Sequence, residues 1–94
     1  MIIRWTSRAL HALTNIHEHI ATDNVLAANT LRDSVVEFVE VKLVTHPMIG
    51  RPGRVAGTRE SIIRPKYIIV YRVVGDVIEI LTVRHVARDW PGQF

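Results

Sequence analysis

The side chains best suited to chemistry lie close to the C-terminal end of the chain. Arg84, His85 and Arg88 fall within five residues of one another. An imidazole exchanges a proton near neutral pH, and arginine binds phosphate through two parallel hydrogen bonds, so the three residues suit phosphodiester cleavage. The alternative is structural, with His85 satisfying a backbone carbonyl at the sheet edge and Arg88 paired with Asp89 or a helix terminus. We favour the structural alternative.

A glycine-rich segment carries further candidates for binding a partner. Arg51 and Arg54 lie in Gly50-Arg-Pro-Gly-Arg54, and Arg59 follows shortly after. Arginines on such a loop could grip phosphates or an acidic surface. Alternatively, the glycines and prolines only turn the chain and the arginines are solvated. We expect the glycines to serve the turn, and the role of the arginines stays open.

Arg72 stands between Tyr71 and Val73 in a run that reads as a strand. A buried charge without a pair costs several kcal/mol, so Arg72 must reach solvent, a carboxylate or a partner. We expect it on the sheet face opposite the helices, in contact with a partner protein. Trp90, beside Pro91, could stack on a nucleic-acid base, although a terminal plug against the sheet is the simpler interpretation.

Sequence signatures of metal and cofactor sites are absent. His17-Glu18-His19 places two imidazoles two residues apart, and successive helical positions differ by about 100°, so these side chains point in nearly opposed directions. The sequence has no phosphate-binding loop, no dinucleotide fingerprint and no nucleophile elbow. We therefore expect neither a cofactor nor a metal.

Composition indicates one folded domain spanning residues 1–94. The chain is 48% hydrophobic, it lacks cysteine, and no apolar run approaches the length of a membrane span. The N-terminus lacks the basic-then-apolar order of a signal peptide, so we expect a cytoplasmic protein without membrane contact. Residues 51–94 hold eight basic and four acidic side chains, and Lys66 is the one lysine among the eight. This arginine excess predicts a nucleic-acid or acidic polypeptide partner.

The N-terminal half predicts a strand followed by two helices. Ile2 to Trp5 is a short apolar run, and Thr6 or Ser7 can cap the helix after it. Asp23 or Asn24 breaks that first helix and can cap the next. The apolar positions of the first helix form one face: Ala9, Leu13, Ile16 and Ile20.

The second helix is ambiguous at its end. A helical stripe is formed by Ala28, Leu31, Val35, Phe38, Val39 and Leu43. Yet Val39, Val41 and Leu43 also alternate with charged residues, as strand residues do. Length favours a helix whose last turn frays or becomes extended. Pro47 ends the element, because proline disfavours helical geometry at His46.

The C-terminal half predicts a loop followed by three strands. Residues 47–57 hold three glycines and two prolines and form the loop. The strands are Arg59 to Arg64, Tyr67 to Val73 and Val77 to His85, and a tight turn at 74–76 makes the last two a hairpin. The expected fold class is α+β with the order β-α-α-β-β-β, an antiparallel sheet with a helical hairpin packed on one face.

With these elements in place, the chain resembles the ParE/RelE family of bacterial toxins. The segments that carry the resemblance are Trp5-Thr-Ser-Arg-Ala-Leu10, Pro47-Met-Ile-Gly-Arg-Pro-Gly-Arg54, Gly57-Thr-Arg-Glu60, Tyr67-Ile-Ile-Val-Tyr-Arg72 and Val77-Ile-Glu-Ile-Leu-Thr-Val-Arg-His-Val-Ala-Arg-Asp-Trp90. The resemblance implies the toxin component of a type II toxin–antitoxin system. It also implies a cognate antitoxin with an acidic C-terminal segment and a DNA-binding N-terminal part. The toxin would then reach operator DNA only through the antitoxin.

The family resemblance leaves the target open between DNA gyrase and mRNA on the ribosome. RelE-like nucleases place lysines on the strand before the hairpin and an arginine after the tyrosine that starts it. Here Arg59 to Arg64 contains no lysine, and Ile68 follows Tyr67. We therefore expect a ParE-like gyrase inhibitor. The alternatives are a ribosome-dependent mRNA endonuclease using Arg84, His85 and Arg88, and a non-toxic member that keeps antitoxin binding.

The residues expected to contact the target or the antitoxin are arginines of the C-terminal half and the terminal tryptophan. They are Arg51, Arg54, Arg59, Arg72, Arg84, Arg88 and Trp90.

Overall fold

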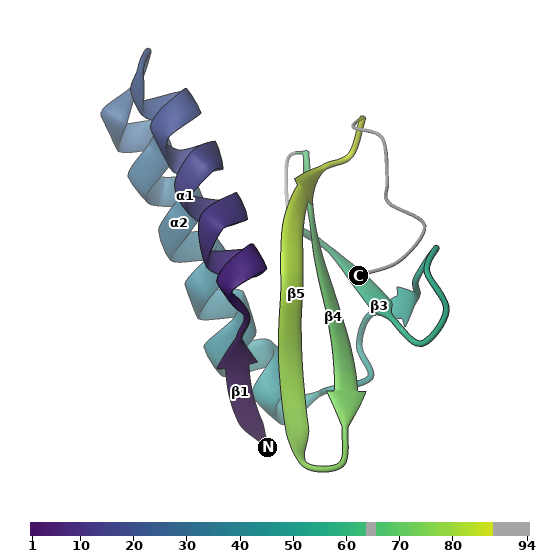
Figure 1. The fold of residues 1–94 in the computed structure, drawn as a ribbon. Coiled ribbons are helices and arrows are strands. Elements are labelled where there is room, and N and C mark those ends of the chain that lie inside the picture. Colours follow the sequence, from purple (N-terminus) through teal and green to yellow (C-terminus); the bar gives the residue numbers. More distant parts are fainter. Residues whose placement is uncertain (64–65, 88–94) are drawn as a thin grey trace.

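A computed structural model describes residues 1–63 and 66–87 of the chain. Its elements, in chain order, are β1 (Ile2–Trp5), α1 (Ser7–Ala21), α2 (Val25–Glu37), the π-helix η1 (Phe38–Leu43), β2 (Arg51–Pro52), β3 (Arg59–Ile63), β4 (Tyr67–Val74) and β5 (Val77–His85). The two helices form a hairpin that stands to one side of the sheet (Figure 1). In the part of the chain that the structure describes, no helix has both the length and the apolarity to cross a membrane.

Both helices begin at side-chain caps, at positions that the sequence predicted. Thr6 Oγ1 accepts a hydrogen bond from the Ala9 amide at 3.1 Å, and the same hydroxyl donates to the Ile80 carbonyl at 2.7 Å. The cap of α1 thereby also fixes the start of the helix to β5. Asn24 Oδ1 accepts from the Ala27 amide at 3.0 Å and caps α2 in the same way.

The second helical stretch stays helical beyond Glu37, where the sequence left a frayed or extended end open. Residues Phe38–Leu43 form a π-helix, and Val39 and Leu43 are fully buried within it while Val41 is exposed. The period-2 pattern of Val39, Val41 and Leu43 was therefore misleading, because burial follows a spacing of four residues. The helical turns stop before Pro47, as predicted.

The sheet is mixed, with strand order β1-β5-β4-β3-β2. The meander β3-β4-β5 is antiparallel, as predicted, but β1 pairs with β5 in parallel. The fold class α+β with a helical hairpin on one face is confirmed, and β1 is the exception to the antiparallel pattern. β2 is an addition inside the predicted loop 47–57, where Arg51 and Pro52 pair with Glu60 and Arg59.

The core lies between the helices and the sheet. Apolar positions of α1 and α2 pack against alternate residues of the meander, with Ile69, Tyr71, Ile78 and Ile80 among the fully buried side chains. The residues between them face the other side of the sheet, where Ile68, Val70 and Leu81 form a separate buried cluster. We call this second side the helix-free face.

Candidate functional site

A β-bulge in β5 decides which side chains of its C-terminal end face the helices. Val70 pairs with Thr82 but Tyr71 pairs with Ile80, so Leu81 is an extra residue in β5. Before the bulge, Ile80 faces the helices, and after it Val83 does. The bulge therefore switches the alternation of β5 and turns residue 85 toward the helical side.

As a consequence, Arg84 and His85 lie on opposite faces of the sheet. His85 is the cross-strand partner of Tyr67, and the two rings meet edge to face with centroids 5.5 Å apart. Arg84 is the partner of Ile68, which belongs to the cluster on the helix-free face. The structure thus turns the side chains of Arg84 and His85 to opposite faces, although both residues line the same cleft. Arg88, the third residue considered for phosphodiester cleavage, lies outside the described residues, as does Trp90.

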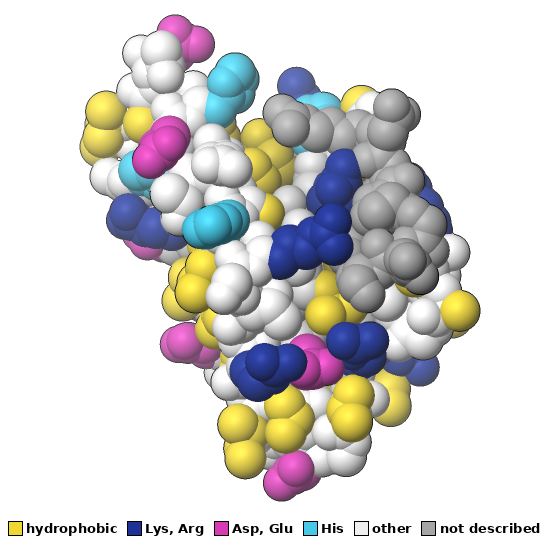
Figure 2. Space-filling view, in the orientation of Figure 1, with side chains coloured by type: hydrophobic (Ala, Val, Ile, Leu, Met, Phe, Trp, Pro, Cys, Tyr) yellow, Lys and Arg dark blue, Asp and Glu magenta, His cyan; other side chains and the backbone are white. Residues whose placement is uncertain are grey.

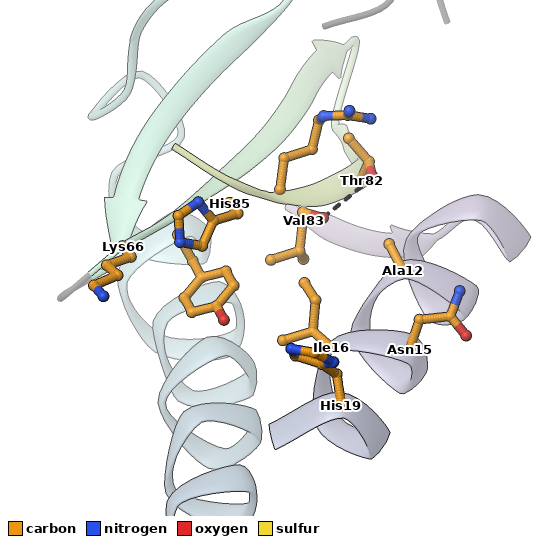
Figure 3. A pocket seen from close by; sticks show the side chains of 10 residues that line it. Ala12, Asn15, Ile16, His19, Lys66, Thr82, Val83 and His85 are labelled. Atoms are coloured by element: carbon orange, nitrogen blue, oxygen red, sulfur yellow. Dashed lines mark hydrogen bonds between the residues drawn. The ribbon is translucent and has the colours of Figure 1, made fainter. Parts of the chain in front are cut away.

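A cleft of about 540 Å³ lies between α1 and the ends of β4 and β5, and we call it the helix–sheet cleft. Figure 2 shows a hollow between the hairpin and the sheet with hydrophobic side chains inside it. Asn15, Ile16 and His19 line it from α1, since residues three and four apart share one helical face. Lys66, Tyr67 and His85 line it from the sheet (Figure 3).

Two hydrogen bonds from backbone amides fix the sheet side of the helix–sheet cleft. The Val86 amide donates to the Lys66 carbonyl at 2.8 Å, which ties the start of β4 to the end of β5. The Ala87 amide donates to His85 Nδ1 at 3.1 Å. Because Nδ1 accepts this bond, the proton of the neutral imidazole lies on Nε2.

The helix-free face carries a row of charges across three strands. Arg72 Nε donates to Glu79 Oε1 at 2.9 Å, and Arg4 pairs with the other oxygen of the same carboxylate. Hydrogen bonding from Arg4 and then from Arg72 lowers the pKa of Glu79, against a smaller opposing effect of burial. Two guanidinium groups share one carboxylate, so the row keeps an excess of positive charge. Arg72 therefore lies where the sequence placed it, but already holds a carboxylate.

Two of the candidate arginines, Arg51 and Arg59, are bound within the protein. Glu60 is 2% exposed, and it accepts a hydrogen bond from Arg51 Nη2 at 3.2 Å and one from the Arg54 backbone amide at 2.8 Å. Arg59 Nη1 donates to the Gly50 carbonyl at 2.7 Å. These contacts support a structural role for Arg51 and Arg59.

The phenol of Tyr71 holds the beginning of the same loop. Its hydroxyl donates to the Pro47 carbonyl at 2.9 Å and accepts from the Gly50 amide at 2.8 Å. A Cβ on Gly50 would lie 2.7 Å from that hydroxyl, so any other residue at this position would force the loop or its neighbours to shift. Gly50 thus permits a close approach of the loop to β4, whereas the sequence had suggested a role in the turn.

Sequence reasoning missed Glu79, Glu60 and most residues of the helix–sheet cleft, although it had singled out Arg84 and His85, which line that cleft. Glu79 could have been found by counting outward from the hairpin turn, since Arg72 and Glu79 are opposite one another. Lys66 and His19 gave no signal, because they are 47 positions apart and no local pattern joins them. Among the described residues, no group of three or more His, Asp or Glu side chains could hold a metal ion.

Comparison with known proteins gives a consistent result. Residues 3–90 match the family model described as the ParE toxin of the type II toxin–antitoxin system parDE. Y4kP of Sinorhizobium fredii, which is named as a candidate toxin, is 43% identical over 90 residues, covering 95% of this chain and 92% of its own length. Toxin RelE2 of Caulobacter vibrioides is 34% identical over 84 residues, with coverages of 89% and 93%. The solved chromosomal ParDE toxin–antitoxin system from P. aeruginosa superposes with a TM-score of 0.78 at 29% identity, covering 92% of this chain and 96% of the other.

Proposed function

The chain belongs to the ParE toxin family of type II toxin–antitoxin systems, and on that premise we propose that it inhibits DNA gyrase by binding and that a cognate antitoxin neutralises it. The names of its relatives divide between ParE and RelE, so family membership alone leaves the target open. Gyrase and the antitoxin both imply action in the cytoplasm, which is part of the proposal.

The observation that carries this proposal is the apolar cluster on the helix-free face. Ile68 is 1% exposed and packs with Val70 and Leu81. The family resemblance puts an arginine of the RelE-like nucleases at the position of Ile68, and lysines on the strand that is β3 here. An isoleucine cannot donate to a phosphate, and β3 reads Arg-Glu-Ser-Ile-Ile. This supports a toxin that binds its target without cutting a phosphodiester.

The charge row on the helix-free face supports an acidic or DNA-bound partner. Arg4 and Arg72 outnumber the carboxylate of Glu79 that they share. The partners proposed are gyrase on DNA and an antitoxin whose acidic C-terminal segment complements this charge. Operator DNA would be reached only through the DNA-binding part of the antitoxin.

Gyrase supercoiling with the purified toxin tests the proposal. We expect supercoiling to slow and cleaved DNA to accumulate, and stoichiometric antitoxin to restore the activity. The same preparation is added to a translation reaction, and mRNA ends are mapped by primer extension. Unaffected gyrase together with ribosome-dependent mRNA cuts would overturn the proposal. If neither occurs and expression without antitoxin is harmless, the chain is a non-toxic member of its family.

A second candidate function is a ribosome-dependent mRNA endonuclease. It is favoured by the 34% identity to a protein named RelE2 and by the imidazole of His85, which could move a proton. His85→Ala should then abolish mRNA cuts, and Arg88→Ala should do the same. Cuts that persist in both variants exclude these residues as the catalytic ones.

A further inference from the structure

The helix–sheet cleft has no role in the proposed inhibition of gyrase, which we place on the helix-free face. We propose that the helix–sheet cleft binds the terminal phosphate of a nucleotide, with Lys66, His85 and His19 as the groups that hold the phosphate. The inference goes beyond the proposed function, since it concerns the opposite face of the sheet.

The charge of the helix–sheet cleft favours an anion. Lys66 and Arg84 are cationic lining residues, and His19 and His85 each contribute an imidazole, while no described lining residue is a carboxylate. Ammonium and imidazole N–H groups form charge-assisted hydrogen bonds with phosphate oxygens. A cation or an acidic metal complex would find no counter-charge among these residues.

His85 lines the helix–sheet cleft and can donate a hydrogen bond from Nε2. Its Nδ1 is occupied by the Ala87 amide at 3.1 Å, which leaves Nε2 as the proton-bearing nitrogen. The edge of the Tyr67 ring, at an interplanar angle of 86°, holds the imidazole in place. The bulge at Leu81 brings this side chain to the helical side, and bulges are found where a side chain is re-aimed toward a site.

The size and floor of the helix–sheet cleft suit a nucleotide better than phosphate alone. Its volume of about 540 Å³ falls within the usual range for small-ligand pockets. Ile16 and Val83 belong to the core side of the cleft and offer apolar surface, and Tyr67 offers an aromatic edge. A base and its sugar can rest on this surface while the phosphate meets Lys66.

Titration of the ¹⁵N-labelled toxin tests the inference, with adenosine monophosphate, adenosine and inorganic phosphate as separate ligands. We expect adenosine monophosphate to shift the backbone amides of residues 15–19, 66–67 and 82–86, and adenosine to bind at least about tenfold more weakly, since it lacks the phosphate. Equal binding of adenosine, or no shift at these amides with millimolar adenosine monophosphate, would overturn the proposal.

Matched variants locate the phosphate. Lys66 is exposed, so Lys66→Gln should fold normally and weaken the binding of adenosine monophosphate by about tenfold. Lys42→Gln removes an equally exposed lysine outside the helix–sheet cleft and should leave binding unchanged. The proposal is wrong if both variants bind as the parent does. Gyrase inhibition by Lys66→Gln should persist, which separates this inference from the proposed function.

A final comparison distinguishes a free nucleotide from the end of a nucleic acid. A 5′-phosphorylated tetranucleotide and its unphosphorylated counterpart are titrated in the same way. Tighter binding of the phosphorylated oligonucleotide than of adenosine monophosphate supports a nucleic-acid end as the ligand. The reverse order supports a free nucleotide.

Discussion

Arg84 and His85 are neighbours in β5, and their side chains leave opposite faces of the sheet. The side chain of Arg84 shares the helix-free face with Arg72, and His85 points to the helical side, where both residues line the helix–sheet cleft. Two residues that are adjacent in the sequence therefore direct their side chains to different faces of the sheet, although both line the helix–sheet cleft. This separation yields the sharpest test of where the toxin meets its target.

The first prediction compares Arg84→Glu with His85→Ala in the gyrase supercoiling assay. We expect Arg84→Glu to weaken inhibition by about tenfold or more, because charge reversal on a complementary interface costs several kcal/mol. His85→Ala should inhibit within about twofold of the parent, since surface changes away from an interface have small effects. If His85→Ala loses inhibition and Arg84→Glu keeps it, the gyrase-binding surface lies on the helical side of the sheet instead.

The second prediction concerns Arg72 and the antitoxin. Arg72→Glu should weaken the toxin–antitoxin complex, because a negative charge would then face an acidic segment. The substitution also breaks the ion pair with Glu79, so the swap Arg72→Glu with Glu79→Arg serves as the control. If the antitoxin depends on the charge at position 72, the swap restores the pair but not the affinity, which calorimetry measures. Unchanged affinity in Arg72→Glu means that the antitoxin binds elsewhere.

The third prediction follows from the lowered pKa of Glu79. A carboxyl whose pKa is lower in the folded than in the unfolded chain stabilises the fold above the unfolded pKa, about 4.3, and loses that effect as pH falls through the folded pKa. Glu79→Gln should therefore reduce the free energy of unfolding at pH 7 and make progressively less difference below pH ~4. Urea denaturation at several pH values measures this difference.

Salt and a matched variant check the cause of that pH dependence. Higher ionic strength should shrink the effect of Glu79→Gln, because the Arg4–Glu79–Arg72 row is partly open to solvent. Glu40→Gln removes an exposed carboxylate of the π-helix that forms no ion pair among the described residues. It should change the free energy of unfolding by less than about 0.5 kcal/mol. The same pH profile in both variants would contradict a specific role of the two arginines.

Local patterns in the sequence were enough to predict the helical hairpin and the meander. Leu13 and Leu31 lie on the buried faces that the helical spacing indicated, and Thr6 and Asn24 cap the two helices. These features depend on residues only a few positions apart. The parallel pairing of β1 with β5 was not predicted, since it joins Ile2 to Val77 across nearly the whole chain.

The candidate site was harder to predict than the fold, because its decisive feature is a backbone irregularity. In a regular strand, side chains alternate between the two faces at every residue. Without the bulge, His85 would therefore lie on the face opposite Ile78 and Ile80. The extra residue Leu81 brings His85 to the same face as Ile78 and Ile80. The residue types in Ile-Leu-Thr-Val do not indicate a bulge. The helix–sheet cleft, which the bulge helps to form, was therefore invisible in the sequence.

The fourth prediction concerns the contact between Gly50 and Tyr71. Gly50→Ala would place a Cβ 2.7 Å from the Tyr71 hydroxyl and 2.9 Å from both the Glu60 carbonyl and Ser61 Oγ. We expect it to lower the free energy of unfolding by about 1–3 kcal/mol through overpacking. Tyr71→Phe should cost about 1–3 kcal/mol, because it leaves the Gly50 amide and the Pro47 carbonyl without their partner.

Tyr67→Phe is the matched control, because its hydroxyl forms no hydrogen bond with another described residue, and it should change stability by less than about 0.5 kcal/mol. The double variant Gly50→Ala with Tyr71→Phe should be less destabilised than the sum of the single variants. Removing the hydroxyl relieves the closest of the three contacts that the new methyl group would make, so the two substitutions share part of their cost. Chemical denaturation of the four variants measures these differences. If the free-energy changes of Gly50→Ala and Tyr71→Phe are strictly additive, the methyl group is accommodated by movement of the loop instead.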